Sequence, residues 1–233
     1  MEALTKEGWM SALIPEEYGG SGLSLTEATV IMEEINRAGG NSGACHGQMY
    51  NMNTLVRFGS KEQREKYLPK LASGELRLQS MGVTEPTTGT DTTKIKTKAI
   101  KKDDRYVING QKVWTSGAHF SDFGILVVRH DPSLEKHKGL TFFFVDMKSP
   151  GIEVKPIKQL TGGSSFNEVY FNDVVIPDSQ RLGEIGDGWK VAITTLMNER
   201  LAVGDADGVD ANEAFELAKK HDKDGEQLID NNA

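Results

Sequence analysis

The sequence predicts an α+β protein with a helical N-terminal block, a central β-barrel and the start of a C-terminal helical bundle. Hydrophobic residues recur at helical spacing early in the chain, alternate with a period of two in its middle, and return to helical spacing after Pro177. We therefore expect a helical domain over residues 1–78, a β-barrel domain over 79–182, and the beginning of a second helical domain over 183–233.

Two helices of the N-terminal block carry start signals. Ser24 is the expected N-cap of a helix over residues 25–35, where apolar side chains fall on one face. Ser60 and Gln63 have the spacing of a capping box, which predicts a second helix that ends before Pro69. The glycine-rich segment 38–43 is expected to be a loop.

The middle of the chain has the signals of short antiparallel strands. Asp103-Asp104 is expected to form a turn, and Asn109-Gly110 is the strongest hairpin signal in the chain. Strand-like runs cover residues 94–99, 106–108, 124–128, 140–145, 152–156, 167–171 and 174–176. Six or more short strands joined by polar turns predict a compact barrel or sandwich.

The C-terminal part returns to a helical pattern. Apolar residues from Trp189 to Met197 lie along one side of a helix that we expect to run to about residue 204. A shorter helical stretch follows at residues 213–219, in an acidic tail.

Composition excludes several classes of function. With 27 basic and 34 acidic residues the net charge is −7, which disfavours nucleic-acid binding because that requires neutralised phosphates. The sequence contains no apolar run of about 18 residues, so it predicts no membrane span.

The single cysteine, Cys45, excludes an internal disulfide. Cys45 and the adjacent His46 form a nucleophile pair only if the fold brings the two side chains together. The other four histidines are too scattered to predict a metal site. The expected location is cytoplasmic, or the mitochondrial matrix in a eukaryote.

Two polar segments are candidates for binding a ligand. Residues 83–91 form a hydroxyl-rich turn after a strand, and Trp114-Thr115-Ser116 places two hydroxyls beside an indole. Backbone N–H groups and hydroxyls of this kind suit a polar heteroaromatic ring, with Gly89 allowing close approach. From chemistry alone, a decorated surface loop is the favoured explanation of residues 83–91.

Five motifs in order make the chain similar to the acyl-CoA dehydrogenase family. They are Ile14-Pro-Glu-Glu-Tyr-Gly-Gly20, the segment from Phe58 to Gly74 with its Tyr67-Leu-Pro69, Val83-Thr-Glu-Pro86 with Gly89-Thr-Asp91, Lys112-Val-Trp114, and Gly186-Asp-Gly-Trp189 with Glu199-Arg200. The resemblance implies an FAD-dependent oxidoreductase that introduces an α,β double bond into an acyl-CoA thioester. In that chemistry a carboxylate removes the α-proton and the β-hydrogen leaves as hydride to the flavin.

The resemblance also implies roles for individual residues. Cofactor contacts are expected from Met81, Val83, Thr84, Gly89, Thr90, Trp114, Thr115 and Ser116. Trp114 would cover the flavin ring, with Thr84 at its pyrimidine edge and Ser116 near N5. Thr90 would also touch substrate, as would Met197, Asn198 and Arg200. The chain departs from the common family pattern at Thr88, Thr90 and Thr115-Ser116-Gly117, but it keeps a hydroxyl at the two critical points.

Glu199 is the candidate catalytic base, as in family members similar to the isovaleryl and long-chain enzymes. Many relatives carry Glu-Arg here and place their base later, so a structural partner of Arg200 remains the alternative.

The family pattern extends beyond this chain at both ends, so the 233 residues are expected to dehydrogenate poorly alone. Expected partners are acyl-CoA, an electron-transferring flavoprotein and further copies of the protein. Two other functions stay open: a flavin monooxygenase or oxidase on the same fold, and a catalytically silent relative.

Overall fold

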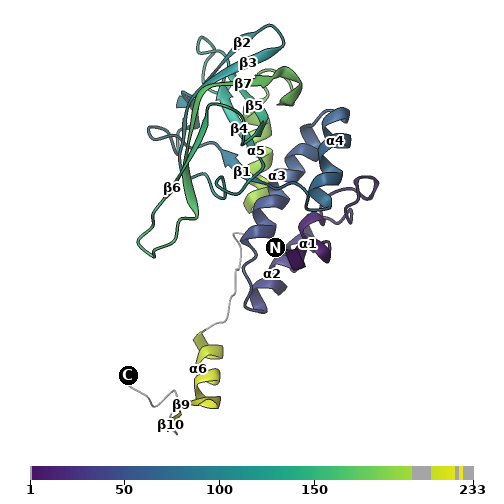
Figure 1. Cartoon of the computed structure of the whole chain (residues 1–233), viewed down its shortest axis with the longest axis vertical. Helices are drawn as coiled ribbons and strands as arrows, with labels where there is room; N and C mark the ends of the chain where they lie inside the picture. The colour runs from purple at the N-terminus through teal and green to yellow at the C-terminus, as the bar shows by residue number, and fades with distance from the viewer. Residues whose placement is uncertain (1, 201–210, 224–225, 228–233) are drawn as a thin grey trace.

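The computed structural model describes residues 2–200, 211–223 and 226–227 (Figure 1). A group of helices from the N-terminal part lies beside a large β-sheet, and one later helix lies between them. The helices are α1 (Glu2–Lys6), α2 (Leu25–Arg37), α3 (Gly43–Phe58), α4 (Lys61–Ala72), α5 (Gly188–Glu199) and α6 (Ala211–Lys220), with short 3₁₀ turns at Trp9–Ser11, Glu16–Tyr18, Thr92–Lys94 and Asp178–Gln180. The strands are β1 (Leu78–Gly82), β2 (Lys98–Lys102), β3 (Arg105–Lys112), β4 (Phe123–Arg129), β5 (Leu140–Asp146), β6 (Ile152–Ile157), β7 (Phe166–Pro177), β8 (Arg181–Leu182), β9 (Asp222–Lys223) and β10 (Glu226–Gln227).

Both predicted helix starts are confirmed. Ser24 caps α2 in a capping box with Glu27, and Ser60 caps α4 in a capping box with Gln63. The predicted end of α4 is wrong, because the helix continues through Pro69 to Ala72. Pro69 and Glu65, whose carbonyl loses its helical donor, are both exposed, while Leu71 is fully buried. Core packing therefore holds the last turn, and water can serve the free carbonyl.

The sheet has eight strands in the order β6-β7-β3-β2-β4-β5-β8, with β1 pairing in parallel with β4. The end strands of this order, β6 and β8, do not pair with each other, so the expected barrel is an open, mixed sheet. Two of the predicted strands, 167–171 and 174–176, are one continuous strand, β7. The strand expected at 94–99 begins only at Lys98, after a 3₁₀ turn.

The hairpin predicted at Asn109-Gly110 is wrong. Both residues lie inside β3, and the pairing of β3 with β7 shifts register between Ile108 and Gly110. A Cβ at Gly110 would lie 2.7 Å from Thr97 Cα, so the glycine permits a close backbone approach at a bulge rather than a turn. The β2–β3 turn is at Asp103-Asp104, as expected, and Asp103 has a positive φ of 55°.

The main core joins the helices to one face of the sheet. It contains Leu55 of α3, Leu71 of α4, Phe142 of β5 and Val191 of α5, all fully buried. Helix α5 packs on α3 and on β5, so its end is held between the N-terminal helices and the sheet. We expected this helix to reach residue 204; it extends to Glu199, and residues 201–210 lie outside the described part of the chain.

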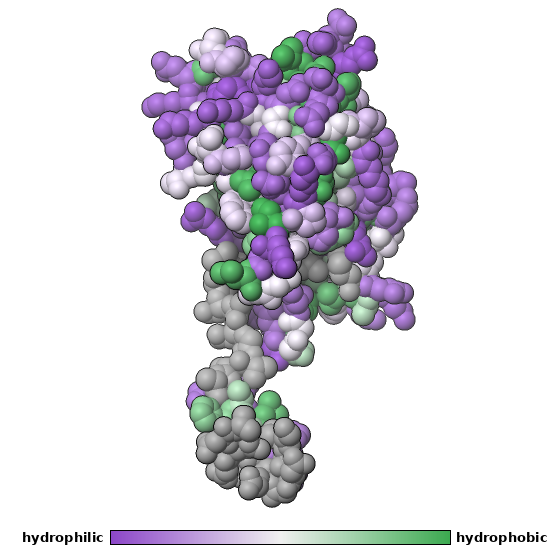
Figure 2. All heavy atoms as spheres, turned by 60° about the vertical axis from the view of Figure 1, so that its left-hand side comes forward, coloured by the Kyte–Doolittle hydropathy of each residue, from purple (hydrophilic) through white to green (hydrophobic). Residues whose placement is uncertain are grey.

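The surface seen in Figure 2 is mostly hydrophilic, with hydrophobic groups in small separate patches. None of the helices in the described ranges has the length and hydrophobicity of a membrane-spanning segment.

Candidate functional site

A buried ion pair organises the first polar segment. Glu85 Oε1 accepts a hydrogen bond of 2.9 Å from Lys112 Nζ, and both side chains are almost completely buried. Lys112 Nζ also donates to the backbone oxygen of Val83 at 3.0 Å. The pair thus ties the turn after β1 to the end of β3.

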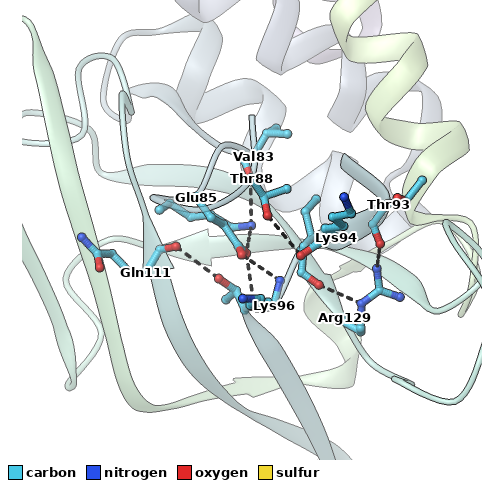
Figure 3. Close-up of polar contacts among 11 residues, drawn as sticks. Val83, Glu85, Thr88, Thr93, Lys94, Lys96, Gln111 and Arg129 are labelled. Carbon is cyan, nitrogen blue, oxygen red and sulfur yellow. Dashed lines mark hydrogen bonds and ion pairs between the residues drawn. The ribbon is translucent and has the colours of Figure 1, made fainter. Parts of the chain in front are cut away.

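The other contacts of Glu85 extend this anchor. Its carboxylate accepts the backbone N–H groups of Lys96 at 2.7 Å and Thr97 at 2.8 Å (Figure 3). Burial alone would raise the pKa of Glu85, but the Lys112 ammonium and these hydrogen bonds outweigh it, and the pKa falls below its usual value. Burial lowers the pKa of Lys112 to about 8, with Glu85 acting in the opposite direction. The carboxylate is therefore held ionised, at the centre of the network.

The following segment is held by Arg129. Its guanidinium donates to the backbone oxygens of Thr93 and Ile95, each at 2.7 Å (Figure 3). It also donates to the backbone oxygen of Lys136 at 3.1 Å. The chain on both sides of the polar turn is thus fixed by charged groups bonded to backbone.

The two polar segments, residues 83–91 and 114–116, lie side by side. Val113 N–H donates to the backbone oxygen of Thr84 at 2.9 Å, which places Thr84 next to Trp114.

Trp114 is held in an unusual conformation with its ring in the open. Its φ is 59°, in the left-handed region that bulky residues rarely occupy, and its side chain is 57% exposed. The edge of Phe166 from β7 supports the indole, with ring centroids 6.1 Å apart. Strain of this kind persists where the surroundings fix it, and it is frequent at binding sites.

Thr115 points the other way. It is 2% exposed and lines a small internal void with apolar residues of β4, β5 and β7, where its hydroxyl has no hydrogen-bond partner among the described residues. Its backbone N–H and oxygen are both bonded to Asn167. Of the three residues 114–116, Trp114 and Ser116 are exposed, whereas Thr115 between them is buried.

The remaining residues of the predicted flavin loop are spread along its length. Met81 and Val83 are half-buried and pack against the main core. Gly89 and Thr90 are exposed beyond the tight turn closed by Glu85 and Thr88.

Ser116 and Glu199 meet in one cavity of about 940 Å³. It lies between α2, α3, the end of α5 and the loops at the ends of β3 and β7, and its lining also includes His46, Tyr50, Gln79, His119 and Phe166. A second cavity of similar volume, between α4 and the β7–β8 turn, contains none of the predicted site residues. The structure therefore brings Ser116 and Glu199 together across more than 80 residues of sequence.

The four predicted residues at the end of α5 face different surroundings. Glu199 is half-buried in the cavity wall, whereas Asn198 is buried against the N-terminal helices and its Nδ2 has no partner among the described residues. Met197 is 59% exposed and Arg200 is exposed. Neither of the last two lines the cavity that contains Glu199.

Sequence reasoning missed four residues of this region. Glu85 and Lys112 were quoted only as parts of motifs, and nothing local indicates that two charged side chains 27 positions apart will be buried together. His46 and Tyr50 have the i, i+4 spacing of one helix face, but the segment that became α3 was not singled out as a helix. Its buried face carries Gln48, Asn51 and Thr54, which hides the usual apolar periodicity.

Comparisons with known proteins agree with this fold. The family description "Acyl-CoA dehydrogenase, N-terminal domain" matches residues 1–75, and "Acyl-CoA dehydrogenase, middle domain" matches residues 80–174. Acyl-CoA dehydrogenase FadE34 of Mycobacterium tuberculosis is 39% identical over 201 residues, covering 86% of this chain and 28% of that protein. Mitochondrial isovaleryl-CoA dehydrogenase of Pongo abelii is 36% identical, covering 84% of this chain and 47% of that protein.

A solved structure, the Tcur3481-Tcur3483 steroid ACAD, superimposes with a TM-score of 0.81 at 34% identity, covering 94% of this chain and 55% of that one. The chain thus spans between about a quarter and a half of the relatives it matches. The two domain matches together cover most of the sequence, and their order is that of the helices and strands described above. On this evidence the chain belongs to the acyl-CoA dehydrogenase family.

Proposed function

We propose that the protein to which this chain belongs binds FAD and introduces an α,β double bond into an acyl-CoA thioester. The observation that carries the proposal is Trp114, an exposed indole fixed in a left-handed conformation beside Thr84 and two residues from Ser116. An exposed aromatic face flanked by hydroxyls fits a planar ring with polar edges. The residues present therefore suit a flavin.

The proposed roles follow from where the side chains lie. Trp114 stacks on the ring, Thr84 bonds its edge, Ser116 lies between the ring and the cavity, and Met81, Val83, Gly89 and Thr90 shape the loop around it. Because the Thr115 hydroxyl faces the internal void, we assign Thr115 a structural part in this site. Bound there, FAD would accept the hydride that leaves the acyl β-carbon.

Glu199 is the proposed base. Its carboxylate would take the proton from the α-carbon of an acyl group lying in the cavity it shares with Ser116. Thr90, Met197, Asn198 and Arg200 remain proposed substrate contacts by resemblance. Since Met197 and Arg200 lie outside the cavity lining, any such contact would be made nearer its mouth.

By the same resemblance, the electron acceptor is an electron-transferring flavoprotein and the working form is a homo-oligomer. The proposed location is cytoplasmic, or mitochondrial in a eukaryote; the mitochondrial relative from Pongo abelii supports the second alternative alone.

Cofactor binding is tested by titrating FAD into the protein while following flavin absorbance and tryptophan fluorescence. Trp114→Ala should weaken FAD binding about fivefold, since aromatic stacking contributes on the order of 1 kcal/mol. Trp9→Ala removes another exposed tryptophan, in the 3₁₀ turn at Trp9–Ser11, and should leave the affinity unchanged. Equal affinities for both variants would contradict the placement of the ring.

Catalysis is tested in the protein expressed from its complete gene and loaded with FAD. Acyl-CoA added without oxygen should bleach the flavin absorbance, and Glu199→Gln should abolish bleaching while FAD stays bound. Reduced flavin that reacts rapidly with oxygen, in preference to an electron-transferring flavoprotein, would favour an oxidase instead.

A further inference from the structure

The contact between α3 and α5 is made by polar groups as well as apolar ones. Thr54 Oγ1 of α3 and Thr195 Oγ1 of α5 are 2.7 Å apart and fully buried. Nearer the cavity, His46 Nε2 of α3 lies 2.7 Å from the backbone oxygen of Glu199. Because a carbonyl oxygen can only accept, His46 Nε2 carries the hydrogen of this bond.

This bond falls at the last turn of α5 that the structure describes. Glu199 is the last residue assigned to the helix, and residues 201–210 lie outside the described part of the chain. The Arg200 N–H donates back to the Leu196 carbonyl, and Asn198 leaves its own Nδ2 without a partner among the described residues. His46 therefore supplies, from another helix, a donor that ties the Glu199 carbonyl to α3.

The same turn presents Glu199 to the cavity. His46, Tyr50 and Glu199 all line it, and the His46 and Tyr50 rings meet edge to face at 5.1 Å. Burial, and then the nearby Glu199 carboxylate, raise the pKa of Tyr50 to about 12. The Glu199 carboxylate thus lies on the α3 side of the helix, close to the residues that hold its backbone.

We propose that His46 is a positioning residue, whose bond to the Glu199 carbonyl fixes the last turn of α5 and thereby aims the Glu199 carboxylate into the cavity. This inference rests on the proposed function for its catalytic part, and on the contact alone for its structural part. Loss of the donor would let the turn that carries Glu199 shift relative to α3, and a displacement of about 1 Å at a reacting group can cost on the order of a hundredfold in rate.

Two substitutions separate the donor from the bulk of the ring. His46→Leu keeps an apolar side chain of similar size and removes the donor, whereas His46→Gln keeps an N–H donor near the position of Nε2. His119→Leu is the matched control, because it removes a histidine from the same cavity wall whose ring bonds Asn167 of β7 rather than α5.

The first measurement is amide hydrogen exchange of the peptide covering residues 188–200, which needs no activity. His46→Leu should accelerate exchange of the last-turn amides about five- to tenfold, the effect of one lost hydrogen bond. His46→Gln should restore most of the protection, and His119→Leu should leave it unchanged. Unchanged exchange in His46→Leu would overturn the inference.

The second measurement is steady-state kinetics of the FAD-loaded protein expressed from its complete gene. His46→Leu should lower kcat by tenfold or more with little change in KM, and His46→Gln should recover most of kcat. Faster exchange with unaltered kcat would overturn the positioning role. Full activity of Glu199→Gln would instead overturn the proposed base, while the exchange result would still report on the contact itself.

Discussion

The ammonium group of Lys112 lies 2.9 Å from Glu85 Oε1, and both side chains are removed from solvent. Among the described residues, each charge is compensated by the other and by backbone groups from two segments, at Val83 and at Lys96-Thr97. The polar turn that carries Thr84 is therefore built around an ion pair that functions as a unit.

Removing one partner of this pair should be costly. We expect Lys112→Met to lower the free energy of unfolding by about 3–5 kcal/mol, because a buried carboxylate is left without its counter-charge. The double variant with Glu85→Gln should lose less than the sum of the single losses. Lys148→Met breaks a pair with Asp122 whose lysine is 75% exposed and should cost less than about 1 kcal/mol. Urea unfolding of the parent, the two single variants, the double variant and Lys148→Met checks this, and additive losses would contradict the coupling.

The same carboxylate should contribute to acid sensitivity. The pKa of Glu85 is lowered in the folded protein from its ordinary 4.5, so its stabilisation is complete above that value and is lost as the pH falls through the folded pKa. The difference in thermal midpoint between the protein and Glu85→Gln should therefore be large at pH 7 and shrink below about pH 4.5. Glu75→Gln, at an exposed pair with Lys70, should show a small difference throughout. A gap for Glu85→Gln that stays constant down to pH 3 would rule out this linkage.

The start of α5 is pressed against β5. A Cβ at Gly188 would lie 2.5 Å from both Leu140 C and Thr141 N, which are backbone atoms that cannot move aside. Gly188→Ala should destabilise the protein by about 1–3 kcal/mol through overpacking. Gly163→Ala, whose Cβ would come no nearer than 3.7 Å to another atom, should be close to neutral. Thermal unfolding of the two variants tests this, and a neutral Gly188→Ala would mean that α5 can shift away from the sheet.

The hydrogen bond between the Thr54 and Thr195 hydroxyls, which joins α3 to α5, should contribute measurably to the free energy of unfolding. Thr195→Val removes the bond to the fully buried Thr54 hydroxyl, which keeps its contact with the Tyr50 carbonyl, and the bond to the Val191 carbonyl, and should cost about 1–2 kcal/mol. The adjacent Thr194→Val loses only a bond to the Lys190 carbonyl at the helix surface and should stay within about 0.5 kcal/mol of the parent. Both values come from urea unfolding. Equal effects of the two substitutions would show that the interhelical bond contributes nothing.

Local signals predicted the parts of the fold that local forces determine. The capping boxes at Ser24 and Ser60 are complete within three residues, so the sequence alone sufficed. The hairpin predicted at Asn109-Gly110 was wrong because the backbone of Thr97 approaches Gly110 closely. Turn statistics describe neighbours in sequence and do not include such a tertiary contact. The helix end predicted before Pro69 was wrong for a similar reason, since the burial of Leu71 outweighs the local stop signal of the proline.

The candidate site likewise contains residues that sequence motifs predict and contacts that only the fold makes. Thr84, Trp114 and Ser116 came from motifs, whereas the backbone bonds beside them, from Val113 to Thr84 and between Thr115 and Asn167, appear only in the fold. His46 could not have been assigned, because its contact with Glu199 spans 153 residues of sequence. The inward turn of Thr115 does not follow from alternation along the chain, since Lys112 three residues earlier is also buried; the left-handed conformation of Trp114 between them breaks the alternation.

The open sheet leaves β6 with one unpaired side, and an unpaired strand can recruit a strand from another molecule. Its sequence opposes this, since Glu153 and Lys155 place opposite charges on exposed positions and Pro156 has no N–H to offer. The other end strand, β8, is only two residues long. Both ends of the sheet are thus poor templates for growth, which should protect the protein from aggregating through strand addition even when it is concentrated.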